Sequence, residues 1–260
     1  MTGLPVLISI PHGGTEVPEE LEGRLCITPR AQFDDSDPFT KEIYDISGSA
    51  KHVIVAPIAR AYVDQNRART RMPPDDPDGL IKSATCYNEP IYVKGMEPDP
   101  RLEEVLIRRY YTTYHDRIAR ACKDGGVVLG LDCHSMAASA PSIAPDAAVA
   151  GQEVGHRPLF CLSNLDGKTC PTDWLERLAD SISESFMIDR GEILLNRPFK
   201  GGHITESFGY RPLPWIQIEM NRSLYLDERW FDADSLKIDR GRLAELNGMF
   251  KDALEWFFAH

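Results

Sequence analysis

The sequence predicts an α/β fold, a single domain whose mostly parallel or mixed central sheet is flanked by helices. Short apolar and β-branched runs alternate along the chain with longer segments of helical period, which is typical of such sheets. A second indication is the run 127–132, which is almost entirely apolar or Gly and suits a strand buried on both faces. Because 260 residues can bury one sizeable core, we expect one domain over residues 1–260.

Composition limits the class of protein. The hydrophobic content of 42% and the charged content of 27% are typical of a globular enzyme, and the net charge of -11 disfavours nucleic acid or an acidic membrane as the partner. The six cysteines form no CxxC pair, the N-terminus lacks the features of a signal peptide, and no apolar run approaches the roughly 20 residues of a membrane-spanning helix. We therefore expect reduced thiols, a cytoplasmic location and no membrane partner, while the oligomeric state stays open.

The first half of the chain contains two predicted strands and one capped helix. Residues 4–10 form a β-branched strand that stops at Pro11-His12-Gly13-Gly14, a turn whose glycines let a ligand approach the backbone closely. Asp37-Pro38 has the residue types of a helix N-cap and first turn, and a second strand is expected over 52–56. Residues 68–98 are rich in Pro, Asp and Gly without a clear period, which indicates a long functional loop.

The second half alternates helices and strands more regularly. The strongest helical pattern begins at Asp99-Pro100 and continues to about Cys122. It leads into the strand 127–132, which is expected to end at Asp132-Cys133-His134-Ser135. Further strands are predicted over 159–162 and 215–220, and further helices over 172–186 and 239–258.

Two histidines that follow predicted strands are the first candidates for a functional site. His12 and His134 are 122 residues apart (134 − 12), and in open α/β sheets ligands bind at the carboxyl ends of the strands. Imidazole and carboxylate groups suit Zn²⁺, and catalytic zinc sites use three protein ligands and a water, so Asp37 is the candidate acid. The alternatives are a hydrogen-bonded loop or core role for each His, and a helix-cap role for Asp37, which its spacing favours.

An acid inside a predicted strand is the candidate base. Glu219 lies in the run 215–220, where an unpaired buried carboxylate costs several kcal/mol, so either a catalytic role or a salt bridge to Arg222 explains it. Cys133 stands next to His134, which suggests a nucleophile. Adjacent residues of an extended chain point to opposite sides, however, so Cys133 is expected to pack inside.

Arginine and histidine residues could bind the substrate. Arg67 and Arg222 each follow an Asn, and the planar guanidinium group grips a carboxylate with two hydrogen bonds; a role at the solvated surface is the alternative. His203 follows two glycines and could donate a hydrogen bond to an oxyanion, although an ordinary turn with an exposed His has the same pattern.

Taken in order, these motifs resemble the N-formylglutamate amidohydrolase family. The match runs from residue 8 to about residue 228, nearly the whole chain, and the order and spacing of the motifs are more specific than any one of them. The motifs are Pro11-His12-Gly13-Gly14, Asp35-Ser36-Asp37, Val63-Asp64-Gln65-Asn66-Arg67, Asp132-Cys133-His134-Ser135, Asp166-Gly167, Phe199-Lys200-Gly201-Gly202-His203-Ile204-Thr205 and Gln217-Ile218-Glu219-Met220-Asn221-Arg222-Ser223-Leu224-Tyr225.

The resemblance implies a zinc-carboxypeptidase-like fold, shared with aspartoacylase-like deacylases, and hydrolysis of the amide of an N-acylated acidic amino acid. By the same resemblance, His12, His134 and Asp37 would hold one zinc ion and Glu219 would be the general base. Arg67 falls on the Asn-Arg motif of the family, so Asn66 and Arg67 would contact the substrate carboxylate, with Arg222 as a further candidate.

The chain departs from the family pattern at three places around the expected substrate pocket. His203 stands where the family often has Tyr, Pro38 where Trp is common, and 68–76 is longer than the usual Asn-Arg-Pro-Pro. The resemblance therefore supports the family's fold and metal for this chain more strongly than it supports the family's substrate. We expect a zinc-dependent amidohydrolase for a small carboxylate-bearing substrate. The alternatives are a carboxypeptidase-like peptidase or another deacylase that uses the same site, and a non-catalytic small-ligand-binding homologue.

Overall fold

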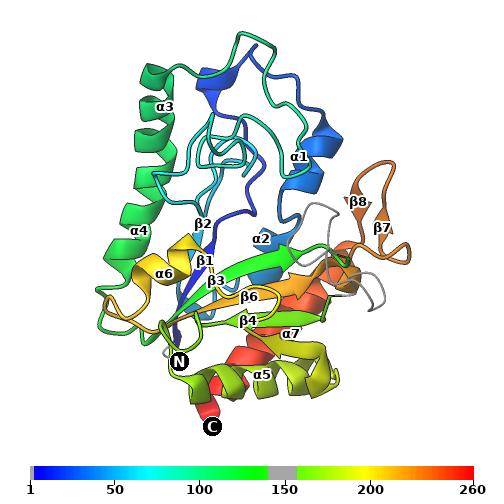
Figure 1. Ribbon diagram of the computed structural model, residues 1–260. Helices are drawn as coiled ribbons and strands as arrows, with labels where there is room; N and C mark the ends of the chain where they lie inside the picture. Colours follow the sequence, from blue (N-terminus) through cyan, green and yellow to red (C-terminus); the bar gives the residue numbers. More distant parts are fainter. Residues whose placement is uncertain (1–2, 140–156) are drawn as a thin grey trace.

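A six-stranded mixed sheet forms the centre of the computed structural model, which describes residues 3–139 and 157–260 (Figure 1). The strand order is β2-β1-β3-β6-β4-β5. Strands β1, β2, β3 and β6 are parallel to one another, whereas β4 pairs antiparallel with β6 and parallel with β5. The predicted α/β fold with a mixed central sheet is confirmed. The strands are β1 (Leu4–Ile10), β2 (Ala50–Val55), β3 (Leu129–Met136), β4 (Phe160–Ser163), β5 (Ile193–Leu195) and β6 (Trp215–Asn221).

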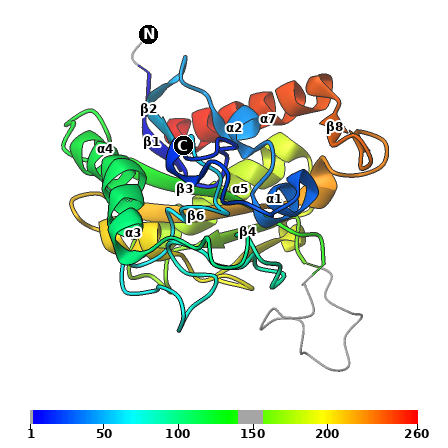
Figure 2. The same ribbon diagram turned by 90° about the horizontal axis from the view of Figure 1, so that it is seen from above.

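Helices cover both faces of this sheet (Figures 1 and 2). One face packs against α2 (Thr40–Tyr44), α5 (Thr172–Phe186) and α7 (Arg240–Ala259). The other face packs against α4 (Thr113–Ala121) and α6 (His203–Phe208). The remaining elements are α1 (Pro29–Asp35), α3 (Pro100–Leu106), the short 3-10 turns η1 (Glu19–Leu21), η4 (Arg190–Glu192) and η5 (Arg222–Leu224), and the hairpin β7 (Phe231–Asp232) and β8 (Lys237–Ile238).

The alternation of side chains along β3 and β6 separates an apolar face from a polar one. Successive residues of a strand point to opposite faces. Leu131 and Cys133 of β3 accordingly belong to the core beneath α5 and α7, which confirms that Cys133 packs inside. Asp132 and His134 point to the other face, where His134 is the register partner of Glu219 on β6. The sequence pattern thus places buried polar groups on one face at the carboxyl ends of two adjacent strands.

Two local predictions are wrong in an informative way. Strand β3 does not stop at Asp132 but continues to Met136, because its polar side chains find buried partners and need no solvent. Helix α2 begins at Thr40 rather than Pro38, since Phe39 adopts a left-handed conformation with φ 62°. No side chain caps α2, so Asp37 is not the helix cap that its spacing favoured.

The predicted helix from Asp99 to Cys122 is confirmed with one irregularity. It consists of α3, a π-helical segment η2 (Ile107–Thr112) and α4. The Asp99 side chain accepts a hydrogen bond from the backbone N–H of Leu102, which is the capping contact expected from this residue type.

Within the described residues, no helix is both long and apolar enough to cross a membrane. All six cysteines are free thiols.

The predicted long loop between β2 and α3 is a packed structure without regular helices or strands. Its residues Leu80, Ile81 and Ile91 are fully or almost fully buried in a second hydrophobic cluster, together with residues of α3 and η2. Lys82 is also fully buried, and its ammonium group lies 2.7 Å from both carboxylate oxygens of Asp35. This connection therefore forms a packed layer beside the edge of the sheet, with core residues of its own.

The contact between β3 and β6 depends on Gly130. A Cβ atom at this position would lie 2.2 Å from the indole ring of Trp215, which is itself fully buried. We expect Gly130→Ala to lower the free energy of unfolding by about 1–3 kcal/mol, because the ring has no free space to move into. Urea unfolding followed by tryptophan fluorescence measures this. Gly125→Ala, which adds a Cβ in open space, is the control, and equal stabilities of the two variants would contradict the expectation.

Candidate metal and substrate site

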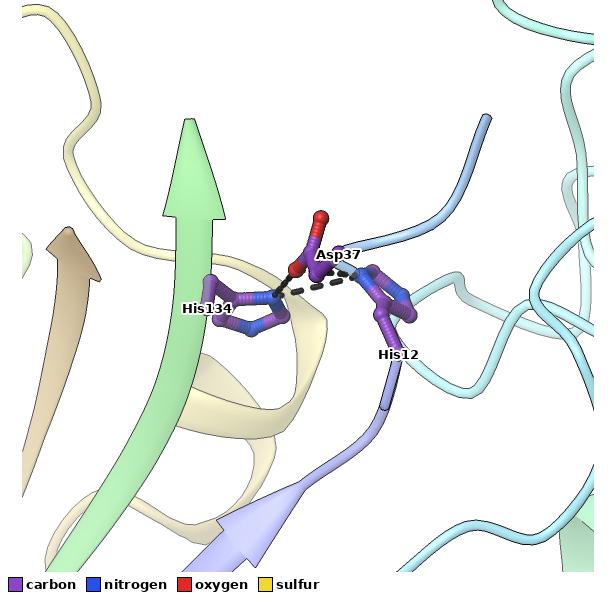
Figure 3. A group of neighbouring side chains, drawn as sticks. All are labelled: His12, Asp37 and His134. Atoms are coloured by element: carbon purple, nitrogen blue, oxygen red, sulfur yellow. Dashed lines mark hydrogen bonds and ion pairs between the residues drawn. The ribbon is translucent and has the colours of Figure 1, made fainter. Parts of the chain in front are cut away.

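Three side chains from separate segments converge at the carboxyl edge of the sheet (Figure 3). His12 follows β1, His134 lies near the end of β3, and Asp37 comes from the turn before α2. The Nδ1 atoms of the two histidines are 3.2 Å apart, and Oδ2 of Asp37 lies 3.0 Å from Nδ1 of His134 and 3.3 Å from Nδ1 of His12. All three side chains are buried. The structure thus brings together the three residues that the sequence proposed as metal ligands.

The spacing and chemistry of this group fit a zinc ion. Donor atoms bound to a tetrahedral zinc ion at roughly 2.1 Å lie about 3.4 Å from one another. The three observed separations, 3.0, 3.2 and 3.3 Å, are close to that value. Two imidazole nitrogens and one carboxylate oxygen also form a donor set that zinc enzymes use. The group could therefore hold one divalent metal ion without rearrangement.

Carboxylates on the outer side of both imidazoles fix their orientation. Nε2 of His12 lies 2.8 Å from Oδ1 of Asp64, and Nε2 of His134 lies 3.2 Å from Oδ2 of Asp132. Both aspartates are fully buried. The metal-free rings hydrogen-bond to Asp37 through Nδ1. With a metal ion bound, each Nε2–H would donate to its carboxylate and each Nδ1 lone pair would face the ion. Metal-binding histidines in proteins have this arrangement almost without exception.

The charges around Asp37 keep it ionised despite its burial. Burial alone would raise the pKa of the Asp37 carboxyl, but the hydrogen bonds and positive charge of His12 and His134 hold this pKa well below its usual range. The other carboxylate oxygen, Oδ1, lies 3.1 Å from Nη2 of Arg222. Asp37 is therefore an anion whose two oxygens are directed separately, one to the histidines and one to Arg222.

Glu219 faces the same edge of the sheet from β6. Burial raises the pKa of its carboxyl from the ordinary 4.5 to about 7; the negative charge of Asp37 adds to this shift, and His134 opposes it. Gln217, two residues earlier on the same face, donates a hydrogen bond of 2.8 Å to Oε1 of Glu219. In the described part of the chain no ion pair joins Glu219 to Arg222. A carboxyl group with a pKa near neutrality is suited to taking up and releasing a proton.

A cleft of about 630 Å³ gives access to this group of residues. Its walls carry several cationic side chains, which suits a small anionic ligand even though the whole chain is acidic. The cleft is lined by His12, Asp37, His134, Glu219, Arg60, Arg67, Arg71, Asp78, Arg157, Phe199, Lys200, His203 and Arg222, among others.

The predicted substrate-binding residues lie in or beside this cleft but already have protein partners. Arg222 donates to Ser135 Oγ as well as to Asp37. Asn66 accepts a hydrogen bond from the backbone N–H of Ile204 at Oδ1, and its Nδ2 donates to Oδ2 of Asp132, the carboxylate that pairs with His134. Asn66 and Arg222 therefore hold the candidate ligands in place. Arg67 has Asp78 as its main partner.

His203 also lines the cleft. It is the first residue of α6, not part of a simple turn, and is half-buried beside Ser207, whose hydroxyl lies 3.3 Å from Nδ1. Burial lowers the pKa of the His203 imidazole, so the neutral form with a single N–H donor is favoured. This position is compatible with donation to a substrate oxygen.

Sequence reasoning gave no role to three residues that shape the site. Asp132 was detectable, because it lies two residues before His134 on the same strand and therefore points to the same face. Gln217 stands in the same relation to Glu219. Asp64 had no such signal, since it comes from an irregular segment whose fold the sequence does not reveal.

The sequence matches one known protein family over most of its length. The family model for N-formylglutamate amidohydrolase matches residues 4–226. The N-formylglutamate deformylase of Pseudomonas putida is 28% identical over 240 residues, covering 86% of this chain and 83% of that protein. The N-formylglutamate deformylase of Pseudomonas aeruginosa is 26% identical over 267 residues, covering 97% of this chain and 94% of that protein.

Solved structures show the same fold. The crystal structure of N-formylglutamate amidohydrolase from Ralstonia eutropha JMP134 superposes with a TM-score of 0.79 at 20% identity, covering all of this chain and 95% of the other. A protein from Agrobacterium tumefaciens superposes with a TM-score of 0.65 at 16% identity, covering 98% of this chain and 89% of the other. Because the family match extends over most of its length, this chain belongs to the N-formylglutamate amidohydrolase family.

Proposed function

We propose that the protein is a zinc-dependent amidohydrolase that removes the acyl group, in the first place formyl, from an N-acylated acidic amino acid. The observation that carries this proposal is the meeting of His12, Asp37 and His134 beside the buried acid Glu219. The names of the Pseudomonas relatives, N-formylglutamate deformylases, support the choice of substrate. Free cysteines support a reducing compartment such as the cytoplasm.

One zinc ion would be held by Nδ1 of His12, Nδ1 of His134 and a carboxylate oxygen of Asp37. When bound, zinc supplies a Lewis acid for a carbonyl oxygen and brings the pKa of a water molecule near 7. Arg222 and Asp64 keep two of these ligands in place from behind, through Oδ1 of Asp37 and Nε2 of His12.

Glu219 is proposed as the general base and then the general acid. It takes a proton from the attacking water and delivers it to the leaving amine nitrogen, so the carboxyl must hold and lose a proton at the working pH. Its pKa of about 7 meets this requirement. The hydrogen bond from Gln217 to Oε1 holds the carboxyl in one orientation during both transfers.

Arg67 is proposed to bind a carboxylate of the substrate, because its guanidinium group lines the cleft close to His12 and Asn66. His203, which lines the same cleft, would donate a hydrogen bond to the carbonyl oxygen as negative charge develops there. Arg222 holds Asp37 directly, and Asn66 holds Asp132, the partner of His134, so both contribute to the ligand group rather than gripping the substrate alone.

A substrate panel tests the proposal. The zinc-loaded protein is assayed with N-formylglutamate, N-acetylglutamate, N-formylleucine and a peptide ending in glutamate, and release of the amino acid is measured. We expect the highest kcat/KM for N-formylglutamate. Preference for the acetyl compound would indicate another deacylase, and preference for the peptide a carboxypeptidase-like enzyme. Absence of turnover on every compound would reject the proposal and favour a ligand-binding homologue.

A further inference from the structure

The guanidinium group of Arg67, the proposed carboxylate contact, is already occupied by the protein itself. Nη2 donates to Oδ2 of Asp78 at 3.0 Å, and Nε donates to the backbone oxygen of Asp78 at 3.1 Å. Nη1 lies 3.5 Å from Oδ2 of Asp64. The Nε–Nη2 edge, which could grip a substrate carboxylate with two parallel hydrogen bonds, is therefore held by Asp78, through its backbone oxygen at Nε and its carboxylate at Nη2.

Asp78 differs from Asp64 in ways that make it replaceable at this edge. Its side chain is 33% exposed and lines the cleft, whereas the Asp64 side chain is fully buried. Asp78 also has a second cationic partner, because its Oδ1 lies 2.6 Å from the ammonium group of Lys82. Lys82 is in turn fixed by both oxygens of Asp35. Asp78 can lose its contact with Arg67 without becoming an unpaired charge.

We propose that Asp78 is a positioning residue that holds Arg67 in the ligand-free protein and is displaced from it by a carboxylate of the substrate. This inference rests on the proposed function. Exchange of one carboxylate for another keeps the guanidinium group paired, whereas a neutral group in the same place would leave it with a weaker partner. Competition with Asp78 thereby selects for ligands that carry a negative charge at this position.

The surroundings keep Asp78 in the charged form that this competition requires. Burial acts to raise the pKa of its carboxyl, but Lys82, Arg60 and Arg67 outweigh burial and lower the pKa below the ordinary value. The formal charges of the buried cluster also balance, with three acids and three bases. These are Asp35, Asp64 and Asp78 against Arg60, Arg67 and Lys82. Neutralising Asp78 alone leaves one positive charge available to an anionic ligand.

The test is the Asp78→Asn variant. We expect KM for N-formylglutamate to fall about three- to tenfold, because the substrate no longer competes with a charged side chain, while kcat stays within about twofold. Binding of glutarate, measured by calorimetry, should tighten by a similar factor. Glutarate binding does not require turnover, so this measurement remains informative even if the wild type hydrolyses none of the proposed substrates.

Two further variants separate this role from a structural one or a general charge effect. Asp76→Asn removes the same charge from the same segment, but Asp76 pairs with Arg71 instead of Arg67, so KM should stay unchanged. In an Arg67→Met background, Asp78→Asn should no longer improve glutarate binding. An unchanged or weaker affinity of a folded Asp78→Asn variant overturns the proposal. An equal gain in Asp76→Asn, or a gain that persists without Arg67, overturns it as well.

Discussion

We expect the Glu219→Gln variant to hydrolyse N-formylglutamate about 10²–10⁴-fold more slowly than the wild type, which is the usual contribution of general acid–base catalysis. Gln has nearly the shape of Glu and can still accept the hydrogen bond from Gln217, but it cannot take a proton from water at neutral pH. Because Glu219 is not among the three candidate ligands, zinc content should stay the same. Steady-state kcat and metal analysis of the same preparation measure both quantities.

The free energy of unfolding provides a control that the Glu219→Gln variant is folded. The pKa of Glu219 rises from 4.5 to about 7 on folding, so the folded protein binds this proton more tightly than the unfolded chain. The contribution of Glu219 to the stability of the wild type therefore falls as the pH rises from about 4.5 through about 7. Gln has no proton to lose, so metal-free Glu219→Gln should be the more stable protein at pH 8, by on the order of 1–3 kcal/mol. A turnover rate close to that of the wild type would remove Glu219 from the mechanism.

The His134→Ala variant is expected to lose both zinc and activity. It removes one of three donors and leaves His12 and Asp37, which are too few for a stable site. Loss of a group that only orients a ligand already costs about 10–100-fold in metal affinity, so loss of a ligand should exceed about 100-fold. Zinc per protein after dialysis, and the dissociation constant from competition with a chelator, measure the effect.

His203→Ala is the matched control for this measurement. It removes an imidazole from the same cleft, but one that does not belong to the three-residue group, so zinc content should be retained while kcat falls. Unchanged zinc content and activity in His134→Ala would end the proposed scheme. Loss of zinc in His203→Ala as well would mean that the cleft, rather than the three donors, determines metal binding.

Much of the fold was predictable because it depends on patterns that repeat along the chain. The apolar runs located β1, β3 and β6, and the helical period located the long helix that begins at Pro100. The pattern failed at the end of β3. There, Asp132 and His134 look like a strand end in sequence, but the folded protein buries them against one another. A sequence shows that a polar residue interrupts an apolar run. It does not show whether the folded chain provides a buried hydrogen-bond or ion-pair partner for that residue.

The sequence identified most residues of the candidate site, but it did not identify all of their contacts and roles. Asp37 has the spacing of a helix cap, and only the folded chain shows that its carboxylate lies between two histidines. Arg67 and Arg222 were predicted to bind a substrate carboxylate, because a guanidinium group can form two parallel hydrogen bonds with it. Their acidic partners Asp78 and Asp37 lie 11 and 185 residues away along the chain, so local pattern could not indicate that these groups are already paired.

The packed connection between β2 and α3 contributes side chains both to the cleft and to the hydrophobic core. Arg67 and Asp78, which face the cleft, belong to the same segment as the core residues Leu80 and Ile81 and the buried Lys82. Transplanting a shorter connection from a relative would exchange part of the hydrophobic core along with the cleft wall. Single substitutions at Arg67 or Asp78 should therefore change substrate preference with less loss of stability than exchange of the whole segment.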